Sequence, residues 1–188
     1  MFSYGWNHRC VDRHESTAKA LLDEDYLTIA EKLDQNYSVL KDLLKGIFLV
    51  REVSARTMDY VLSFGERNSN FIIAQALQKR GITAQYLDAR DIIVTNKDFG
   101  AAKVDFKSTN EQVQVYFAET TDIQIVTGFI AADKGGLTTT LGRGGSDYTA
   151  SILAGALDAE DLEIWTDVDG VLTSDPRKVK KAFTVDRL

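Results

Sequence analysis

A glycine-rich stretch, "TTTLGRGGSDYTA" from residue 138 to 150, carries the residues best suited to chemistry. Gly142, Gly144 and Gly145 stand just before a stretch with helical spacing. A glycine loop that leads into a helix presents unpaired backbone N–H groups and the positive end of the helix dipole, and both favour an anion. The stretch lacks the lysine of a P-loop and the spacing of a dinucleotide fingerprint. It predicts an anion-binding loop, with a plain turn capped by Ser146 or Asp147 as the alternative.

Arg143 lies between two of these glycines. Because a glycine-flanked position contributes little to helix formation or packing, we attribute the arginine to its planar guanidinium, which pairs with carboxylates and phosphates. Asp147 follows in the first predicted helical turn, where an acidic side chain also favours the helix dipole. The pattern therefore predicts Arg143 as an anion ligand and leaves a functional and a purely structural explanation for Asp147.

A second loop, "WTDVDGVLTSDPR" from residue 165 to 177, combines hydroxyl groups, carboxylates and an arginine after an apolar stretch. If Gly170 is aligned with the sixth position of an EF-hand, Trp165 and Pro176 fall where oxygen ligands are required, so a calcium loop is excluded. A loop of this composition at a strand end could instead hold a nucleotide and its magnesium. An acidic surface turn is the alternative.

Helices and short apolar strands alternate over much of the chain. Apolar residues at steps of three and four between residues 22 and 47 predict one long helix or a broken pair. Gly81 is predicted to lie at a helix end, and Ser108 with Glu111 to form a capping box. Further helices are predicted at 54–64, 67–80, 108–119 and 146–157, strands at 82–89, 91–95, 102–106 and 122–131, and a turn at 133–136.

This alternation predicts an α/β fold with a largely parallel sheet. Ligands of such sheets gather at the carboxyl ends of the strands. By that rule we expect Gly128, the glycine loop (residues 142–145) and the loop after Asp167 to form the functional site.

Composition limits the class of protein. The 188 residues are 44% hydrophobic, carry a formal net charge of −6 and contain one cysteine, Cys10. The acidic balance disfavours a nucleic-acid partner, and the lone thiol with no zinc-like spacing favours a reduced cytoplasm and no metal site in the protein. The chain has no signal-peptide core and no apolar run long enough to cross a membrane. His8 and His14 lie in a polar beginning of the chain and are expected to be solvated.

Three stretches together resemble aspartokinases, which phosphorylate the side-chain carboxylate of L-aspartate. They are "SFGERNS" at 63–69, the glycine loop with its flanks, and "EIWTDVDGVLTSDPR" at 163–177. The third is shared with relatives such as glutamate 5-kinase and uridylate kinase, and the first two narrow the resemblance. "WTDVDG" is further similar to the kinase half of bifunctional aspartokinase/homoserine dehydrogenases. The resemblance implies an amino-acid-kinase fold, a three-layer αβα sandwich, and ATP-dependent formation of 4-phospho-L-aspartate.

The resemblance also implies roles for individual residues. Glu66 and Arg143 match the positions that hold aspartate, whereas without the resemblance Glu66 would be read as a first-turn acid of the helix at 67–80. Asp147 would orient catalytic lysines, and Mg²⁺ would be carried by ATP. The other implied contacts are Gly144, Gly145 and Ser146 with substrate or phosphate, Thr166, Asp167 and Val168 with adenine and ribose, and Asp175 and Arg177 with the phosphates.

Family segments on both sides are not found in this sequence: an opening Lys-Phe-Gly-Gly-Thr strand, a later lysine segment and ACT domains. We therefore expect residues 1–188 to be an internal piece of the catalytic domain, without measurable kinase activity alone, and to self-associate through uncovered strand edges. The alternatives are another amino-acid kinase, such as glutamate 5-kinase, and a non-catalytic module that binds a nucleotide or an amino acid.

Overall fold

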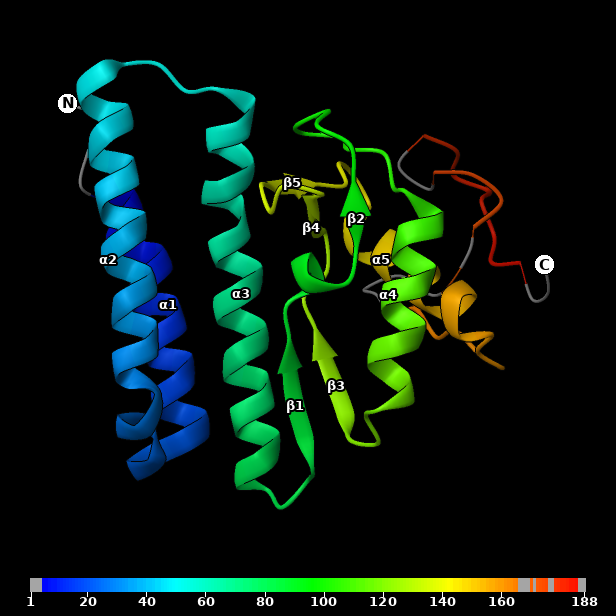
Figure 1. The fold of residues 1–188 in the computed structure, drawn as a ribbon, viewed down its shortest axis with the longest axis horizontal. Coiled ribbons are helices and arrows are strands. Elements are labelled where there is room, and N and C mark those ends of the chain that lie inside the picture. Colours follow the sequence, from blue (N-terminus) through cyan, green and yellow to red (C-terminus); the bar gives the residue numbers. More distant parts are fainter. Residues whose placement is uncertain (1–4, 166–169, 171, 176–177, 186–188) are drawn as a thin grey trace.

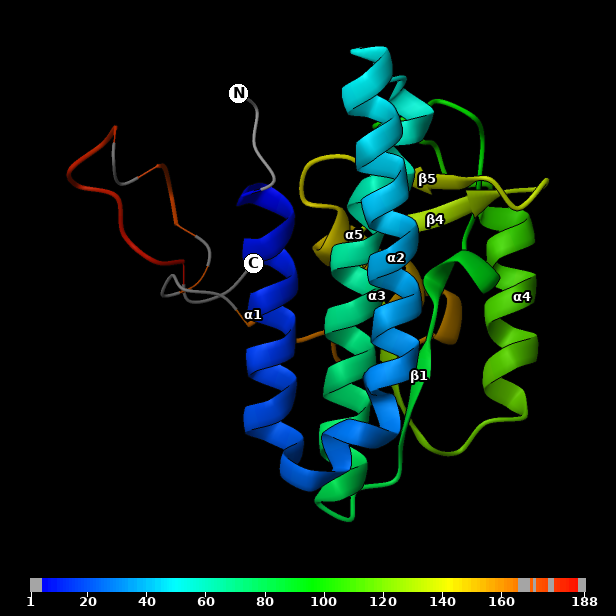
Figure 2. The same ribbon diagram turned by 90° about the vertical axis from the view of Figure 1, so that its left-hand side faces the viewer.

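The computed structural model describes residues 5–165, 170, 172–175 and 178–185. Helices cover a central group of strands on two sides (Figure 1). On one side α3 packs against the strands, and α1 and α2 form an outer pair against α3 (Figure 2). On the other side lie α4 and α5, which contact each other. The helices are α1 (Gly5–Leu22), α2 (Tyr26–Val50), α3 (Ala55–Lys79), α4 (Phe106–Ala118) and α5 (Gly145–Leu157), with short 3-10 turns at Asp23–Asp25 and Ala89–Asp91.

The strands form two small groups. The first pairs β1 (Ala84–Leu87) with β3 (Ile123–Val126) in parallel. The second pairs β2 (Val94–Thr95) in parallel with β4 (Ile130–Asp133), which also pairs with β5 (Thr138–Thr140) in antiparallel fashion. The α/β fold and the largely parallel pairing are therefore confirmed, and only β5 runs against its neighbour.

Two predicted strands differ in the structure. The stretch 122–131 is interrupted at residues 127–129, so it forms β3 and β4 rather than one strand. The stretch 102–106 is reduced to a single bridge between Val104 and Thr95. The reason lies next to it, where Asp105 accepts a hydrogen bond from the Ser108 N–H at 3.2 Å and caps α4. The predicted capping box beginning at Ser108 is therefore wrong, because the helix already begins at Phe106.

The outer helices share a core. The apolar stripe predicted at 22–47 lies mostly on α2, and the chain breaks just before Tyr26, as in the alternative of a broken pair. The beginning of the chain is helical, and His14 is half-buried rather than solvated, stacked on Tyr37 with ring centroids 6.5 Å apart. Burial, followed by the charge of Arg13, lowers the pKa of His14. This core is built from Ala18, Leu22, Ile29, Leu33, Tyr37, Ile72 and Ala76.

Helix α3 runs without a break through the "SFGER" stretch. The sequence predicts two helices there, at 54–64 and 67–80, and the structure has one. Its end agrees with the prediction, since Gly81 has a φ of +76° and donates its N–H to the Gln78 carbonyl at 2.9 Å. Glu66 lies in the interior of α3, so the explanation of Glu66 as a first-turn acid is wrong.

Gly65 offers a test of this continuous helix. Apart from its chain neighbours and the nearby backbone of the helix, no heavy atom of the described residues lies within 4 Å of a Cβ built on Gly65. Because glycine in a helix interior is less stable than alanine by about 0.5–1 kcal/mol, Gly65→Ala is expected to raise the free energy of unfolding by about that amount. Urea denaturation of the two chains measures the difference. A destabilised variant would show that the backbone at Gly65 needs a conformation that alanine cannot adopt.

A second core lies between the strands and helices α4 and α5. It gathers buried residues from the strands, the loop after β1 and both helices, including Ile93, Val113, Ala131 and Ile152. This core fixes α5 against the strands and with it the glycine loop. None of the described helices is both long and apolar enough to cross a membrane.

Candidate substrate site at the carboxyl end of strand β3

Gly128 lies between a residue of helix α3 and a residue of helix α5. It lies just beyond the carboxyl end of β3, and its N–H donates to the Glu66 carboxylate on α3. A Cβ built on Gly128 would stand 2.9 Å from both Cβ and Oγ of Ser146, and 3.1 Å from its Cα. Only a glycine permits this approach without a shift. The structure thus brings together Glu66, Gly128 and Ser146, which the sequence separates widely.

The glycine loop turns the chain from β5 into α5. Gly142 and Gly144 have φ values of +77° and +73°, a region that side chains rarely occupy. Gly144 is the N-cap of α5 and no side chain caps the helix, so the predicted alternative of a turn capped by Ser146 or Asp147 is not what the structure has. The first turn closes with the Tyr148 N–H donating to the Gly144 carbonyl at 3.0 Å. The N–H groups of Ser146 and Asp147 find no acceptor among the described residues, as expected at a helix start.

Three polar side chains surround this helix start. Arg143, Ser146 and Asp147 are exposed. Within the described part of the chain, neither the Arg143 guanidinium nor the Asp147 carboxylate has an ion-pair partner. Both charges are therefore available to a ligand.

Glu66 is held in a different environment. Its carboxylate is half-buried, and burial raises its pKa, although the Gly128 N–H and the Asn70 amide act in the opposite direction. Asn70 donates to the Glu66 backbone carbonyl at 2.8 Å and reaches the carboxylate at 3.5 Å. A partly desolvated carboxylate with a fixed orientation is suited to bind an ammonium group.

Two residues that sequence reasoning missed hold the site in place. Thr149 accepts the Phe129 N–H at 3.0 Å and donates its hydroxyl to the Gly145 carbonyl at 2.9 Å. Phe129 has a φ of +66° and packs so closely that a Cβ on Gly145 would lie 2.7 Å from its ring. Thr149 therefore joins the β3–β4 connection to the glycine loop. The sequence signal available was the threonine four residues after Gly145, on the same face of α5.

Comparison with known proteins agrees with this arrangement. Residues 11–188 match the model of the amino acid kinase family. The chain belongs to the amino acid kinase family. It is 38% identical over 156 residues to lysine-sensitive aspartokinase 3 of Escherichia coli (strain K12). This alignment covers 79% of this chain and 35% of that protein. It is 35% identical over 181 residues to the chloroplastic bifunctional aspartokinase/homoserine dehydrogenase 1 of Zea mays. This second alignment covers 94% of this chain and 20% of that protein.

The solved structures extend the likeness to the fold. The crystal structure of E. coli aspartokinase III in complex with aspartate and ADP superimposes with a TM-score of 0.85 at 34% identity, over 98% of this chain and 42% of that one. The resemblance to aspartokinases and the amino-acid-kinase fold are thus confirmed. This amino acid kinase chain spans 20% to 35% of the length of the two curated relatives above.

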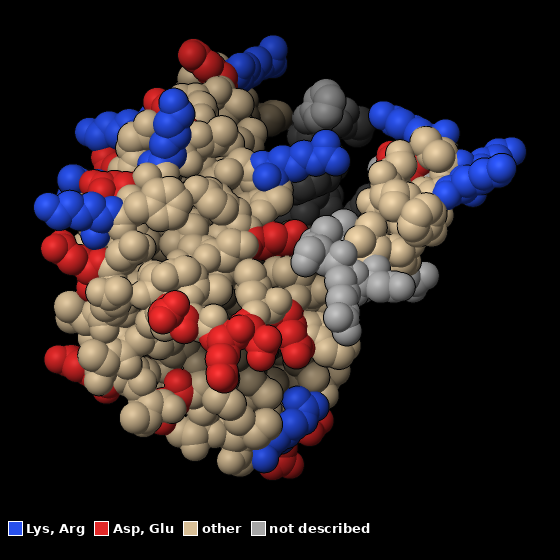
Figure 3. All heavy atoms as spheres, turned by 90° about the vertical axis from the view of Figure 1, so that its right-hand side faces the viewer, with Lys and Arg blue, Asp and Glu red and all other residues tan. Residues whose placement is uncertain are grey.

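The residues expected to bind nucleotide in this amino acid kinase all belong to the loop after Trp165. Thr166, Asp167, Val168 and Arg177 lie outside the described residues. Asp175 is half-buried, and its backbone carbonyl accepts the N–H groups of Lys178 and Val179, both at 2.9 Å. Figure 3 shows acidic side chains gathered on the face that carries α4 and α5, and basic side chains on the segment that stands away from it. The nucleotide contacts remain a prediction.

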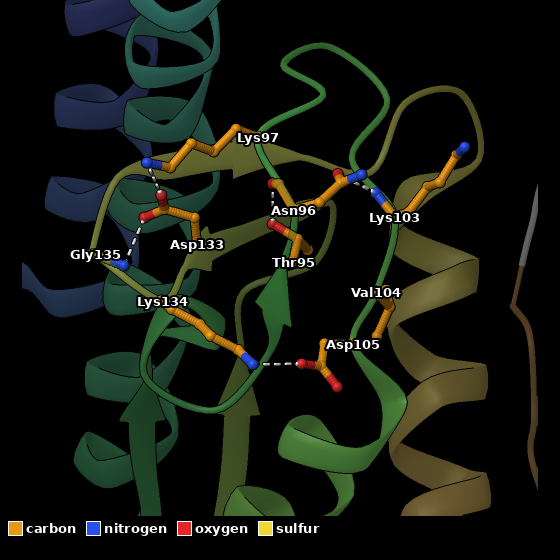
Figure 4. Close-up of a pocket in the computed structure, with 9 residues that line it drawn as sticks. All are labelled: Thr95, Asn96, Lys97, Lys103, Val104, Asp105, Asp133, Lys134 and Gly135. Carbon is orange, nitrogen blue, oxygen red and sulfur yellow. Dashed lines mark hydrogen bonds and ion pairs between the residues drawn. The ribbon is translucent and has the colours of Figure 1, made fainter.

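A separate pocket of about 560 Å³ lies at the opposite end of β4 from Gly128 (Figure 4). Four of its charged side chains form ion pairs, with Lys97 Nζ 3.4 Å from Asp133 Oδ2 and Lys134 Nζ 2.9 Å from Asp105 Oδ2. The Lys134 ammonium, together with Ser108, lowers the pKa of Asp105 to about 2. Asp133 also accepts the Gly135 and Leu137 N–H groups, which shapes the predicted turn at 133–136. These ion pairs and hydrogen bonds hold the β4–β5 turn and the start of α4.

Proposed function

We propose that this amino acid kinase chain is part of a catalytic unit that binds L-aspartate beside Gly128 and transfers the γ-phosphoryl group of ATP to its side-chain carboxylate, which gives 4-phospho-L-aspartate. The observation that carries the proposal is the approach of Glu66 to Ser146 across Gly128, close in the chain to Arg143, which has no ion-pair partner among the described residues. It is supported by the likeness to an aspartokinase solved with aspartate and ADP.

The zwitterionic end of aspartate needs two opposite charges. We assign its ammonium group to the half-buried Glu66 carboxylate, which already has a fixed orientation from Gly128 and Asn70. We assign its α-carboxylate to Arg143, because a guanidinium can hold a carboxylate through two parallel hydrogen bonds. Ser146, Gly144 and Gly145 would then line the space where the side-chain carboxylate meets the phosphate.

The reaction asks for little acid–base chemistry. The side-chain carboxylate of aspartate is ionised at neutral pH, so one of its oxygens forms a bond to the γ-phosphorus as the bond to the bridging oxygen breaks and ADP leaves. Catalysis then rests on bringing two anions together and stabilising the charge that spreads over the phosphoryl oxygens. The unpaired N–H groups of Ser146 and Asp147 at the start of α5 suit that task. We propose that Asp147 orients the cationic groups of the reaction.

ATP is assigned to the loop after Trp165. Thr166, Asp167 and Val168 would border adenine and ribose, and Asp175 with Arg177 would lie nearer the phosphates. Among the described residues no three His, Cys, Asp or Glu side chains are grouped so that they could hold a metal ion. We therefore propose that Mg²⁺ is bound mainly through the phosphate oxygens of ATP and water, which is common for this ion.

The comparisons favour aspartate over the alternatives of a glutamate 5-kinase and a non-catalytic binding module, because the curated relatives are aspartokinases or bifunctional aspartokinase/homoserine dehydrogenases. We further propose a homo-oligomer, supported by the exposed apolar side chains Phe48, Leu49 and Val50 at the end of α2. A cytoplasmic location is also proposed, although the plant relatives are named chloroplastic.

Calorimetric titration of the chain with L-aspartate tests the proposal. Glu66 must be ionised to hold an ammonium group, and burial raises its pKa above the ordinary 4.5. The affinity for aspartate is therefore constant near neutral pH and declines as the pH falls towards the raised pKa, beginning above pH 4.5. Glu66→Gln is expected to bind about fivefold more weakly at neutral pH, through a loss of about 1 kcal/mol, and to lose this pH dependence.

Glu31→Gln provides the matched control, since Glu31 is an exposed residue of α2. Its aspartate affinity and pH profile should equal those of the unchanged chain. If Glu66→Gln also kept both, Glu66 would not be the ammonium ligand.

A further inference from the structure

We propose that Asp59 is a positioning residue that fixes the glycine loop, and with it Arg143, relative to Glu66. Asp59 lies on α3 and is 1% exposed. Its Oδ2 accepts the N–H groups of Gly100 at 2.9 Å and Thr140 at 3.0 Å. Its Oδ1 accepts the Thr140 hydroxyl at 2.8 Å. The proposal rests on the proposed function for the identity of the ligand.

The surroundings of Asp59 are unusual for a buried carboxylate. Among the described residues it has no ion-pair partner, so three neutral donors hold its charge. A buried charge without a cation is costly unless such donors have fixed positions, and hydrogen bonds to an ionised acceptor are the stronger kind. The carboxylate therefore requires Gly100 and Thr140 to stay where they are.

Both of these partners lie at the base of the glycine loop. Thr140 is the last residue of β5, two residues before Gly142 and three before Arg143. The Gly100 carbonyl stands 3.3 Å from a Cβ built on Gly142, so the chain at Gly100 supports the loop from outside. The Ala102 N–H donates to the Thr140 carbonyl at 2.8 Å and completes the connection. One carboxylate thus joins the strand that enters the loop to the segment that supports it.

The same helix carries the opposite side of the site. Glu66 follows Asp59 by seven residues on α3, which is about two turns, so the two side chains share a face and are separated by about 10 Å along the axis. Glu66 binds one end of the zwitterion, and Asp59 holds the loop that binds the other. Helix α3 therefore sets the separation between the ammonium and α-carboxylate contacts, and we infer that Asp59 determines how closely these two contacts match the charged groups on the Cα of aspartate.

The test compares Asp59→Ala with Asp59→Asn. Asparagine can accept both N–H groups through its amide oxygen and donate to the Thr140 hydroxyl, which is also an acceptor. Hydrogen exchange followed by mass spectrometry reports the loop directly, and calorimetry reports L-aspartate and ADP affinity. In Asp59→Ala we expect faster exchange over residues 99–102 and 138–147, tenfold or more weaker aspartate binding and unchanged ADP binding. Asp59→Asn should keep the protection of the loop and bind aspartate within about threefold of the unchanged chain.

Thr109→Val is the matched control. The Thr109 hydroxyl is fully buried, accepts the Val94 N–H at 3.0 Å and lies on α4, away from the glycine loop. Its loss should lower the stability of the chain and leave both loop exchange and aspartate affinity unchanged. Should Asp59→Ala not fold, Thr140→Val removes one of the three bonds, and a smaller change in the same two peptides is expected.

Unchanged exchange over residues 138–147 in Asp59→Ala, or in Thr140→Val if that variant replaces it, would overturn the proposal. Faster exchange there in a chain that does not bind aspartate before substitution would support the positioning role and contradict the proposed function. The two ideas therefore fail separately.

Discussion

Replacing Arg143 by alanine is expected to weaken L-aspartate binding by about thirtyfold or more, while ADP binding changes much less. Arg143 lies between two glycines whose φ angles fall in the left-handed region. Its side chain is exposed, and the guanidinium has no ion-pair partner among the described residues. Loss of a charge-assisted pair of hydrogen bonds to a carboxylate costs about 2 kcal/mol, which corresponds to that factor. Calorimetric titration with each ligand measures both affinities.

Two further variants sharpen this prediction. Arg143→Lys keeps the charge but loses the planar fork, so it should bind aspartate with intermediate affinity. Arg80→Ala removes another exposed arginine, 14 residues beyond Glu66 at the end of α3, and should change nothing. An equal loss of aspartate and ADP affinity in Arg143→Ala would show that the loop holds a phosphate rather than the α-carboxylate.

Gly128→Ala is expected to affect both the fold and the site. The new Cβ would lie 2.9 Å from the Ser146 side chain and 3.1 Å from its Cα, so backbone has to move. Overpacking of this kind costs about 1–3 kcal/mol of stability. Either Ser146 or the Gly128 N–H must also leave its place beside Glu66, and we expect the aspartate affinity to fall more than tenfold. Urea denaturation and calorimetry measure the two effects.

Gly155→Ala is the control for this substitution. Gly155 lies in the same helix as Ser146, and among the described residues no heavy atom beyond its chain neighbours and the nearby helix backbone comes within 4 Å of its added Cβ. The alanine should stabilise the helix slightly and leave aspartate binding as it was. A Gly128→Ala chain that binds aspartate normally would mean that the contact between Gly128 and Ser146 is not part of the site.

The features that could be predicted from sequence depend on local chemistry. The glycine loop before α5, Gly81 beyond the end of α3 and the turn at 133–136 each follow from backbone requirements that a few neighbouring residues reveal. The resemblance then connected Glu66 with Arg143. Neither composition nor spacing could place these two residues on the same side of the molecule.

The features that could not be predicted depend on distant contacts. Gly65 remains helical because buried neighbours such as Phe64 and Asn68 hold α3 in place, and this packing outweighs a glycine penalty of about 1 kcal/mol. The interruption of the strand predicted at 122–131 coincides with the positive φ of Phe129, which packs against Gly145. Asp59 gave no signal at all, since its partners lie 41 and 81 residues further along the chain.

Those two separations have a consequence for how the protein acquires its structure. Hydrogen bonds that join α3 to the segment of α1 and α2 close loops of 31 to 57 residues, whereas the bonds between Asp59 and Thr140 close a loop of 81 residues. The entropy lost in closing a loop rises with its length, so contacts of this kind are among the last that folding makes favourable. A partly folded chain that keeps only helices α1 to α3 would carry Glu66 without the glycine loop opposite it. Binding competence therefore belongs to the completely folded chain alone.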